Sequence, residues 1–212
     1  MGRIKFFIRN PTQLLLVALS RIPYFNFIRD SAYSSDYITF SQWFTQKIIG
    51  KNREAYWPVH SSSKVVGVHN IYAGIDTNPG FKPGCYIQGT GKLHIGDYTR
   101  IAMNVGIMSG SHEVYNHKVF VENETIIGEY CWIGMNSVIL PGVKLGDFTK
   151  VGAGSVVTKS FPDGYCIIAG NPAKLIKSLD PAKCIRYSNK IEYYGYIKKN
   201  KFALYRRKYL KI

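Results

Sequence analysis

Acidic residues are scarce in this 212-residue chain, which has 13 Asp and Glu against 28 Lys and Arg and a formal net charge of +15. The excess of positive charge lies at the two ends. Residues 1–29 hold five basic residues and no acid, and residues 181–212 hold ten basic residues against Glu192 alone. The stretch between them is nearly neutral, so the charge belongs to the ends and not to the centre of the chain.

The chain also lacks paired cysteines and long apolar runs. Its four cysteines include no CxxC pair, which argues against a zinc ribbon, and Cys131 is expected to fill the core. The longest apolar run near the start, Leu14–Leu19, is far shorter than the about 20 residues of a membrane span. No secretory cleavage signal is visible. These shortages predict a cytoplasmic protein with free thiols.

What the chain has in abundance is a six-residue repeat. Residues 121–162 divide into the blocks VENETI, IGEYCW, IGMNSV, ILPGVK, LGDFTK, VGAGSV and VTKSFP. Each block opens with Val, Ile or Leu, and the fifth place is mostly small. This period fits neither an α-helix nor a strand, whereas a fixed hexapeptide repeat is typical of a parallel β-helix. We therefore expect an all-β solenoid whose block-opening side chains point inward.

A single interruption breaks the register of the repeat. Earlier blocks open at Ile95, Ile101 and Ile107, but Ile127 is out of phase with them. Removing eight residues, 113–120, restores the phase, so we predict that EVYNHKVF forms a loop leaving the wall. Such interruptions often carry function.

Three blocks to a coil would place residues 18 apart in one column. With the eight-residue loop removed, this rule puts His112 in a column with Val138 and Val156. It also puts Met135 and Ala153 on the same face as His112. The wall is expected to span 71–172.

The flanking regions are predicted to be helical or irregular. Residues 1–70 would form an N-terminal cap, with a helix near 39–50. Residues 1–30, basic and apolar together, suit either a helix on the open end of the solenoid or an interfacial membrane anchor. Residues 173–212 would form a basic tail, in which Asp180 caps a helix or helix pair interrupted at Gly195.

Three motifs stand in order between about Ile95 and Lys177: IGDYTRIAMNVGIMSGSHEVYNH, CWIGMNSVILPGVKLGDFTKVGAGSVVTKSFP and AGNPAKLIK. They resemble the hexapeptide-repeat acyltransferases, nearest to galactoside and maltose acetyltransferases and the sugar O-acetyltransferases of bacterial capsule and O-antigen clusters. The resemblance implies a left-handed parallel β-helix that works as a homotrimer. It also implies acetyl transfer from acetyl-CoA to a hydroxyl, or less often an amine, in a cleft between two subunits.

The resemblance carries roles onto individual residues. His112 matches the catalytic base, and the backbone N–H of Met135 matches the thioester contact. Coenzyme A contacts correspond to Ala153, Thr158, Lys159, Lys174 and Lys177. Trp132 is either a wall of the pantetheine channel or a corner-packing residue, His117 would line the acceptor site, and Glu113 would orient His112 or face solvent. Where galactoside acetyltransferases carry an acceptor-binding Asn, this chain has Gly84, so acceptor identity is not inherited.

These observations predict an acetyl-CoA-dependent O-acetyltransferase acting on a saccharide of a bacterial surface polysaccharide, without a metal. Histidine suits removal of a hydroxyl proton, and a backbone N–H suits the oxyanion. A sugar-nucleotide N-acetyltransferase and an antibiotic-modifying enzyme remain open. A γ-carbonic-anhydrase-like zinc site would need His112, His117 and a third ligand such as Asp76. The tyrosine-rich basic tail would suit nucleic acid, which we do not expect, or an anionic membrane surface.

Overall fold

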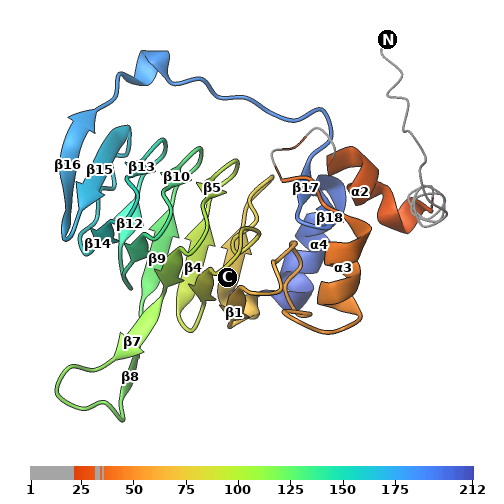
Figure 1. Ribbon diagram of the computed structural model, residues 1–212, viewed down its shortest axis with the longest axis horizontal. Coiled ribbons are helices and arrows are strands. Elements are labelled where there is room, and N and C mark those ends of the chain that lie inside the picture. The colour runs from red at the N-terminus through yellow and green to blue at the C-terminus, as the bar shows by residue number, and fades with distance from the viewer. Residues whose placement is uncertain (1–21, 32–33, 35) are drawn as a thin grey trace.

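The computed structural model describes residues 22–31, 34 and 36–212, so the Leu14–Leu19 run and most of residues 1–30, for which a helix or a membrane anchor was expected, lie outside the described residues. Three sheets form a three-sided prism, with the helical cap at one end (Figure 1), and all their strand pairs are parallel except β15 with β16. Sheet A contains β1 (Lys64–Val66), β3 (Tyr86–Gln88), β6 (Gly106–Met108), β11 (Val138–Ile139) and β14 (Val156–Val157). Sheet B contains β2 (Ile71–Ala73), β4 (Lys92–Ile95), β9 (Glu124–Ile127) and β12 (Lys144–Leu145). Sheet C contains β5 (Arg100–Ile101), β10 (Trp132–Ile133), β13 (Lys150–Val151), β15 (Cys166–Gly170) and β16 (Ala173–Ser178).

The interior of the prism follows the six-residue pattern. The block-opening side chains of the later coils are almost fully buried, as expected; they are Ile127, Ile133, Ile139, Leu145, Val151 and Val157. Small polar side chains at the fifth place are buried as well, and their hydroxyls bond to backbone carbonyls. Thr99 donates to Gly128 at 2.7 Å and Ser137 to Gly152 at 2.9 Å. These hydroxyls are thus satisfied, which removes the penalty for burying them.

Glycine in the second place of a block lets adjacent coils approach. A Cβ at Gly134 would lie 2.6 Å from the backbone nitrogen of Ala153 in the next coil. That distance is too short for any side chain, so the repeat needs glycine there to keep the coils hydrogen-bonded.

The interruption is longer than the sequence analysis predicted. Strand partners are 32 positions apart across it, as for Ile95 and Ile127, and 18 apart beyond it, as for Ile133 and Val151. The insertion therefore has 14 residues, and it contains the antiparallel strands β7 (Gly110–His112) and β8 (Phe120–Glu122). Figure 1 shows this β7–β8 hairpin projecting from the wall.

The predicted column of His112 with Val138 and Val156 is consequently wrong. Val138 pairs with Gly106 on one side and Val156 on the other, while His112 belongs to the stem of the hairpin. Val121 is 39% exposed on β8 and does not open a wall block.

The N-terminal cap is small and aromatic. It contains η1 (Pro23–Phe25), α2 (Asn26–Asp30) and α3 (Phe40–Lys47), and η3 (Val68–Asn70) follows at the start of the wall. The helix expected near 39–50 is confirmed. Thr39 accepts a hydrogen bond from the Gln42 N–H and the Gln42 side chain accepts one from the Thr39 N–H, a reciprocal N-cap.

The helix or helix pair expected after Asp180, interrupted at Gly195, is confirmed only beyond Gly195, where α4 (Lys199–Tyr209) lies. Asp180 does cap a helical turn, but that turn is only η4 (Pro181–Lys183). An extended strap follows and runs back along the prism to β17 (Tyr193–Tyr194), β18 (Ile197–Lys198) and α4, which lie at the cap (Figure 1). Strand β16 after residue 172 and strand β1 before residue 71 extend the wall beyond its expected range.

An aromatic ladder on one corner of the prism holds this strap. Tyr98, Tyr130, Phe148 and Tyr165 follow one another at centroid distances of 5.3, 5.0 and 5.2 Å. The Arg186 guanidinium of the strap lies over two of these rings and pairs with Glu129 and Asp147. Tertiary contacts with the ladder therefore override the helical propensity of the tail.

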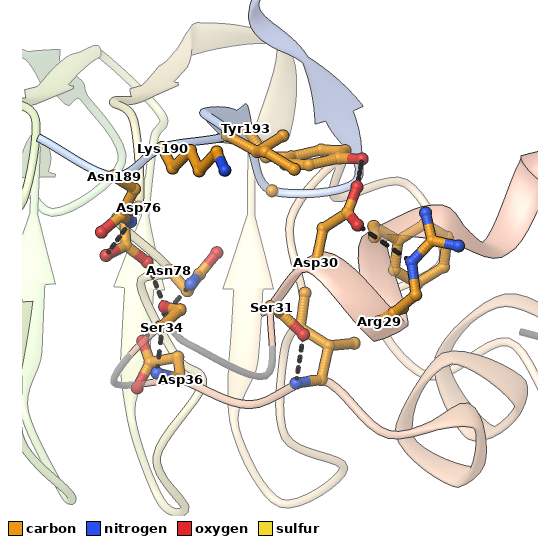
Figure 2. A pocket seen from close by; sticks show the side chains of 14 residues that line it. Arg29, Asp30, Ser31, Ser34, Asp36, Asp76, Asn78, Asn189, Lys190 and Tyr193 are labelled. Carbon is orange, nitrogen blue, oxygen red and sulfur yellow. Dashed lines mark hydrogen bonds and ion pairs between the residues drawn. The ribbon is translucent and has the colours of Figure 1, made fainter. Parts of the chain in front are cut away.

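The strap and the cap meet over the first coil, around a cavity that Figure 2 shows. Asn189 donates to Asp76 at 3.0 Å, and the Tyr193 hydroxyl donates to Asp30 at 2.7 Å. Asp76 also pairs with Arg100 at 2.5 Å. These carboxylates are taken up by partners in the chain itself, and they fix the cap and the strap to the wall.

Candidate functional site

The β7–β8 hairpin fixes the histidine that the sequence singled out. His112 is exposed at the end of β7, opposite Phe120 on β8, and the two rings meet edge to face at 5.3 Å. Its Nδ1 lies 2.6 Å from the backbone carbonyl oxygen of His117. Because a carbonyl oxygen only accepts, Nδ1 carries the proton of the neutral ring and Nε2 keeps its lone pair. The geometry therefore prepares Nε2 to take up a proton.

The rest of the hairpin loop gathers around His112. His112, Glu113, Val114 and His117 line one shallow hollow. The Glu113 carboxylate accepts from the backbone N–H groups of Tyr115 and Asn116, at 3.0 and 2.6 Å. It thus stabilises the turn, and the group that orients His112 is the carbonyl of His117. The sequence contained no signal for this carbonyl, since any residue type would supply it.

Met135 and Ala153 occupy the corner between sheets C and A on successive coils, as predicted. Gly134 donates to Val151 at 2.9 Å and Gly154 donates to Met135 at 2.8 Å, which fixes the two turns one above the other. Both residues are exposed. Within the described part of the chain, no hydrogen bond uses the Met135 N–H. Met103 precedes them in the same column, because Asn136 donates to its carbonyl at 3.2 Å.

Trp132 stands on the outer face of sheet C, 55% exposed. It pairs with Arg100 and Lys150 on the neighbouring strands, and it lines a groove of about 700 Å³ between sheet C and the strap. Lys177 lines the same groove. Lys150 was not predicted as a site residue. The spacing of 18 residues per coil would have placed it beside Trp132 on the next strand of the wall.

The other predicted cofactor residues are exposed but do not share that groove. Lys174 is on β16, beyond the groove. Thr158 and Lys159 follow β14 at the corner between sheets A and B, the corner from which the β7–β8 hairpin also leaves, though on a later coil. A single chain therefore holds His112 at one corner and the Met135 N–H at another, and no described cavity contains both.

The zinc alternative gains nothing from the geometry. The described residues contain no group of three or more His, Cys, Asp or Glu side chains arranged for a metal ion. Asp76, the third ligand that this alternative would need, is paired with Arg100. Across residues 22–31, 34 and 36–212, no helix is long and apolar enough to cross a membrane.

Comparison with known proteins agrees with this wall. The family model for the bacterial transferase hexapeptide (six repeats) matches residues 124–159. A galactoside O-acetyltransferase of Escherichia coli (strain K12) is 38% identical over 91 residues, covering 41% of this chain and 44% of that protein. A chloramphenicol acetyltransferase of Agrobacterium fabrum (strain C58 / ATCC 33970) is 30% identical over 145 residues, covering 56% of this chain and 69% of that protein. This chain belongs to the hexapeptide-repeat acetyltransferase family.

The family membership confirms the resemblance drawn from the three sequence motifs. A solved galactoside acetyltransferase in complex with coenzyme A has the same fold, with a TM-score of 0.52 and 23% identity, over 82% of this chain and 88% of that one. The chain spans about half the length of the first curated relatives that it matches, with 47%, 41% and 48% of three of them covered.

Proposed function

We propose that this protein transfers an acetyl group from acetyl-CoA to a hydroxyl of a saccharide, in the biosynthesis of a bacterial surface polysaccharide. The observation that carries the proposal is the exposed His112 on a hairpin of a hexapeptide-repeat wall, with its Nδ1 proton fixed on the His117 carbonyl. A galactoside O-acetyltransferase is among the relatives, and we propose the left-handed coil of that family for this wall.

In this mechanism Nε2 of His112 accepts the proton of the acceptor hydroxyl as that oxygen bonds to the acetyl carbonyl carbon. The Met135 N–H donates to the carbonyl oxygen while that oxygen carries negative charge. In other enzymes one such donor contributes a factor of about 10²–10³ to the rate. The carbon–sulfur bond then breaks, and His112 returns its proton to the leaving thiolate. Acetyl-CoA supplies the activated acyl group, and the protein needs no covalent intermediate and no metal.

Two features of the chain support the binding of coenzyme A. Trp132 and Lys177 offer an apolar wall and a cation in one groove, and the Met135 N–H is unused within the described chain. We assign coenzyme A contacts to these residues together with Ala153, Thr158, Lys159 and Lys174. His117 and Glu113 would face the acceptor on the hairpin side.

We further propose a homotrimer with shared sites, which the separation of His112 from Met135 supports. Because one chain keeps His112 and Met135 at different corners of the prism, the proposed site would form where the β7–β8 hairpin of one copy meets the sheet C–sheet A corner of another. Size-exclusion chromatography with light scattering measures the assembly directly.

An acceptor screen tests the activity. Acetyl-CoA consumption is measured with the full chain against sugars, oligosaccharides, sugar nucleotides, chloramphenicol and a macrolide, with mass analysis of each product. A saccharide ester is the expected product. If the best product were a sugar amide or an acetylated antibiotic, the saccharide hydroxyl would not be the acceptor. An antibiotic is the second candidate acceptor, because one relative is a chloramphenicol acetyltransferase.

We also propose peripheral contact of the protein with the inner face of the cytoplasmic membrane, and no binding of nucleic acid. Arg207, Lys208 and Lys211 are exposed on or next to α4, and no described acid pairs with them. Each such cation near an anionic surface contributes about 1 kcal/mol. Replacing all three by Gln should weaken sedimentation with phosphatidylglycerol vesicles on the order of 100-fold, whereas Lys64, Lys92 and Lys118 replaced together serve as the control. Equal losses of vesicle binding in the two triple variants, or equal binding of the unmodified protein to neutral and anionic vesicles, would contradict the proposed membrane contact.

A further inference from the structure

A second groove lies between the cap helices and α4, far along the chain from the hairpin and the corner turns. It measures about 620 Å³. Its lining residues are mostly aromatic side chains and lysines: Pro23, Tyr24, Asn26, Phe27, Trp43, Lys47, Tyr56, Tyr193, Tyr196, Ile197, Lys198, Asn200, Lys201 and Tyr205. None of them belongs to the candidate active site.

The charge of this cap–α4 groove is one-sided. It holds Lys47, Lys198 and Lys201 and no acid among the described residues, and the chain outside the described residues contains no Asp or Glu either. No ion pair in the described chain uses any of the three lysines. Asp30, whose carboxylate accepts from the hydroxyl of the lining residue Tyr193 at 2.7 Å, is not itself a lining residue.

Lys47 is the most unusual member. Its ammonium group donates to the backbone carbonyls of Arg53 and Ala55, at 2.7 and 2.6 Å, and lies 5.4 Å from the Tyr196 ring centroid. Two of its three N–H bonds are used, and no anion compensates the charge. Burial lowers the pKa of Lys47 to about 8, since water is partly excluded without a counter-charge in its place. A bound anion would remove this cost.

The aromatic side chains give the groove a flat apolar wall. Tyr24 is 66% exposed, and Trp43 packs edge to face against it at 6.1 Å. Tyr205 and Asn200 are at the α4 side and make no side-chain hydrogen bond within the described chain. Ligand sites typically combine such apolar walls with a few polar groups that fix orientation, and lysine binds phosphate as a point charge.

We infer that the cap–α4 groove binds a phosphorylated saccharide, with the sugar ring against the aromatic wall and the phosphate on Lys198, Lys201 and Lys47. This site is separate from the candidate active site, and it would hold a saccharide phosphate at the end of the prism opposite β16. Binding of a saccharide phosphate in this groove does not depend on the acetyl transfer proposed above. If the acceptor is a saccharide, however, both sites would serve one substrate.

Isothermal titration calorimetry of the full chain tests the inference. The probes are glucose 1-phosphate, glucose and inorganic phosphate. The test variant is Lys198→Gln with Lys201→Gln, and the matched control is Lys208→Gln with Lys211→Gln, which removes the same charge outside the groove. Glucose 1-phosphate should bind at least tenfold more tightly than glucose or inorganic phosphate. The groove variant should lose at least tenfold in affinity, and the control should stay within twofold.

Several results would overturn the inference. They are no binding of glucose 1-phosphate, equal losses in both double variants, or equal binding of inorganic phosphate, which would indicate an unspecific basic surface. Loss of phosphatidylglycerol-vesicle binding in the groove variant, without any sugar phosphate binding, would assign the groove to a lipid headgroup instead. Acetyl-transfer assays on the same variants separate this failure from failure of the proposed activity.

Discussion

At the residue scale, the corner turns combine structural and functional demands at adjacent positions. Asn136 and Asn104 have φ values of 58° and 57° at equivalent corners, and Met135 and Met103 precede them. Positive φ at the third residue of a turn, preceded by a residue that tolerates proline, is the pattern of a type II turn. Both methionines are therefore replaceable by proline without changing the turn, yet only the Met135 N–H has a role in the proposed chemistry.

Met135→Pro removes this N–H and should lower the acetyl-transfer rate by about 10²–10³, with little change in the melting temperature. Met103→Pro, one coil earlier at the same corner, should stay within a few-fold of the unmodified protein. Steady-state rates and thermal unfolding of both variants check this. If the two variants lost activity equally, the Met135 N–H would not be the oxyanion donor.

Cys131 provides a second residue-scale prediction, concerning pH. It lies in one column with Thr99 and Thr149, and burial raises the pKa of its thiol to about 12. The unfolded thiol ionises near pH 9 and the native thiol does not, so its contribution to stability is complete below pH 9 and is lost as pH rises toward 12. Between pH 8 and 10 this loss is about 1.4 kcal/mol.

Cys131→Thr continues the column of hydroxyls and should reduce the loss of unfolding free energy between pH 8 and 10 by that amount. Cys85 and Cys166, whose pKa values burial also raises, leave a residual slope. Urea unfolding at both pH values, at one protein concentration, gives the comparison. An unchanged slope would show that Cys131 ionises in the native protein.

At the element scale, the sequence predicted the strands of the wall better than the hairpin and the tail that leave it. The repeat identified the inward residues Ile133, Ile139 and Val151 because burial acts on every coil alike. It could not give the length of the hairpin, since removing 8 or 14 residues restores the same six-residue phase. The tail was misread for another reason, because the contacts of Arg186 and Tyr187 with the aromatic ladder are too distant in sequence for local propensity to reveal.

The turn between β17 and β18 yields a prediction for this tail. Gly195 has φ +57°, and a Cβ there would lie 2.3 Å from Cα of Trp57, whereas Gly154 has φ +69° and open space around it. Gly195→Ala should cost about 3 kcal/mol of stability through backbone strain plus overlap, and Gly154→Ala about 1 kcal/mol through strain alone. Denaturant unfolding compares them, and equal costs would contradict the close packing of this turn on Trp57.

At the scale of the whole molecule, the account depends on two copies sharing one site. His112 and Met135 are both exposed. The sequence placed them on one face of one chain, where the structure does not put them. An insertion six residues longer than expected moved the histidine off the wall. The proposed chemistry therefore requires assembly of at least two copies.

Subunit mixing tests this sharing. His112→Ala and Met135→Pro chains, each inactive alone, are unfolded together and reassembled. Mixed oligomers contain some sites with an intact His112 from one copy and an intact Met135 from its neighbour. Random mixing of equal amounts makes about a quarter of the sites intact, so activity should recover to about a quarter or less of the unmodified rate. Mixtures that regain no activity, though they assemble, would place both groups in one chain's own site.

The most direct test of the central claim is the acetyl-transfer rate of His112→Ala at saturating acetyl-CoA and acceptor. The account predicts a loss of at least about 10²-fold, with melting temperature and oligomeric state unchanged, because His112 is exposed and supports only its own hairpin. A folded His112→Ala oligomer that keeps more than a tenth of the activity would show that another group takes the proton.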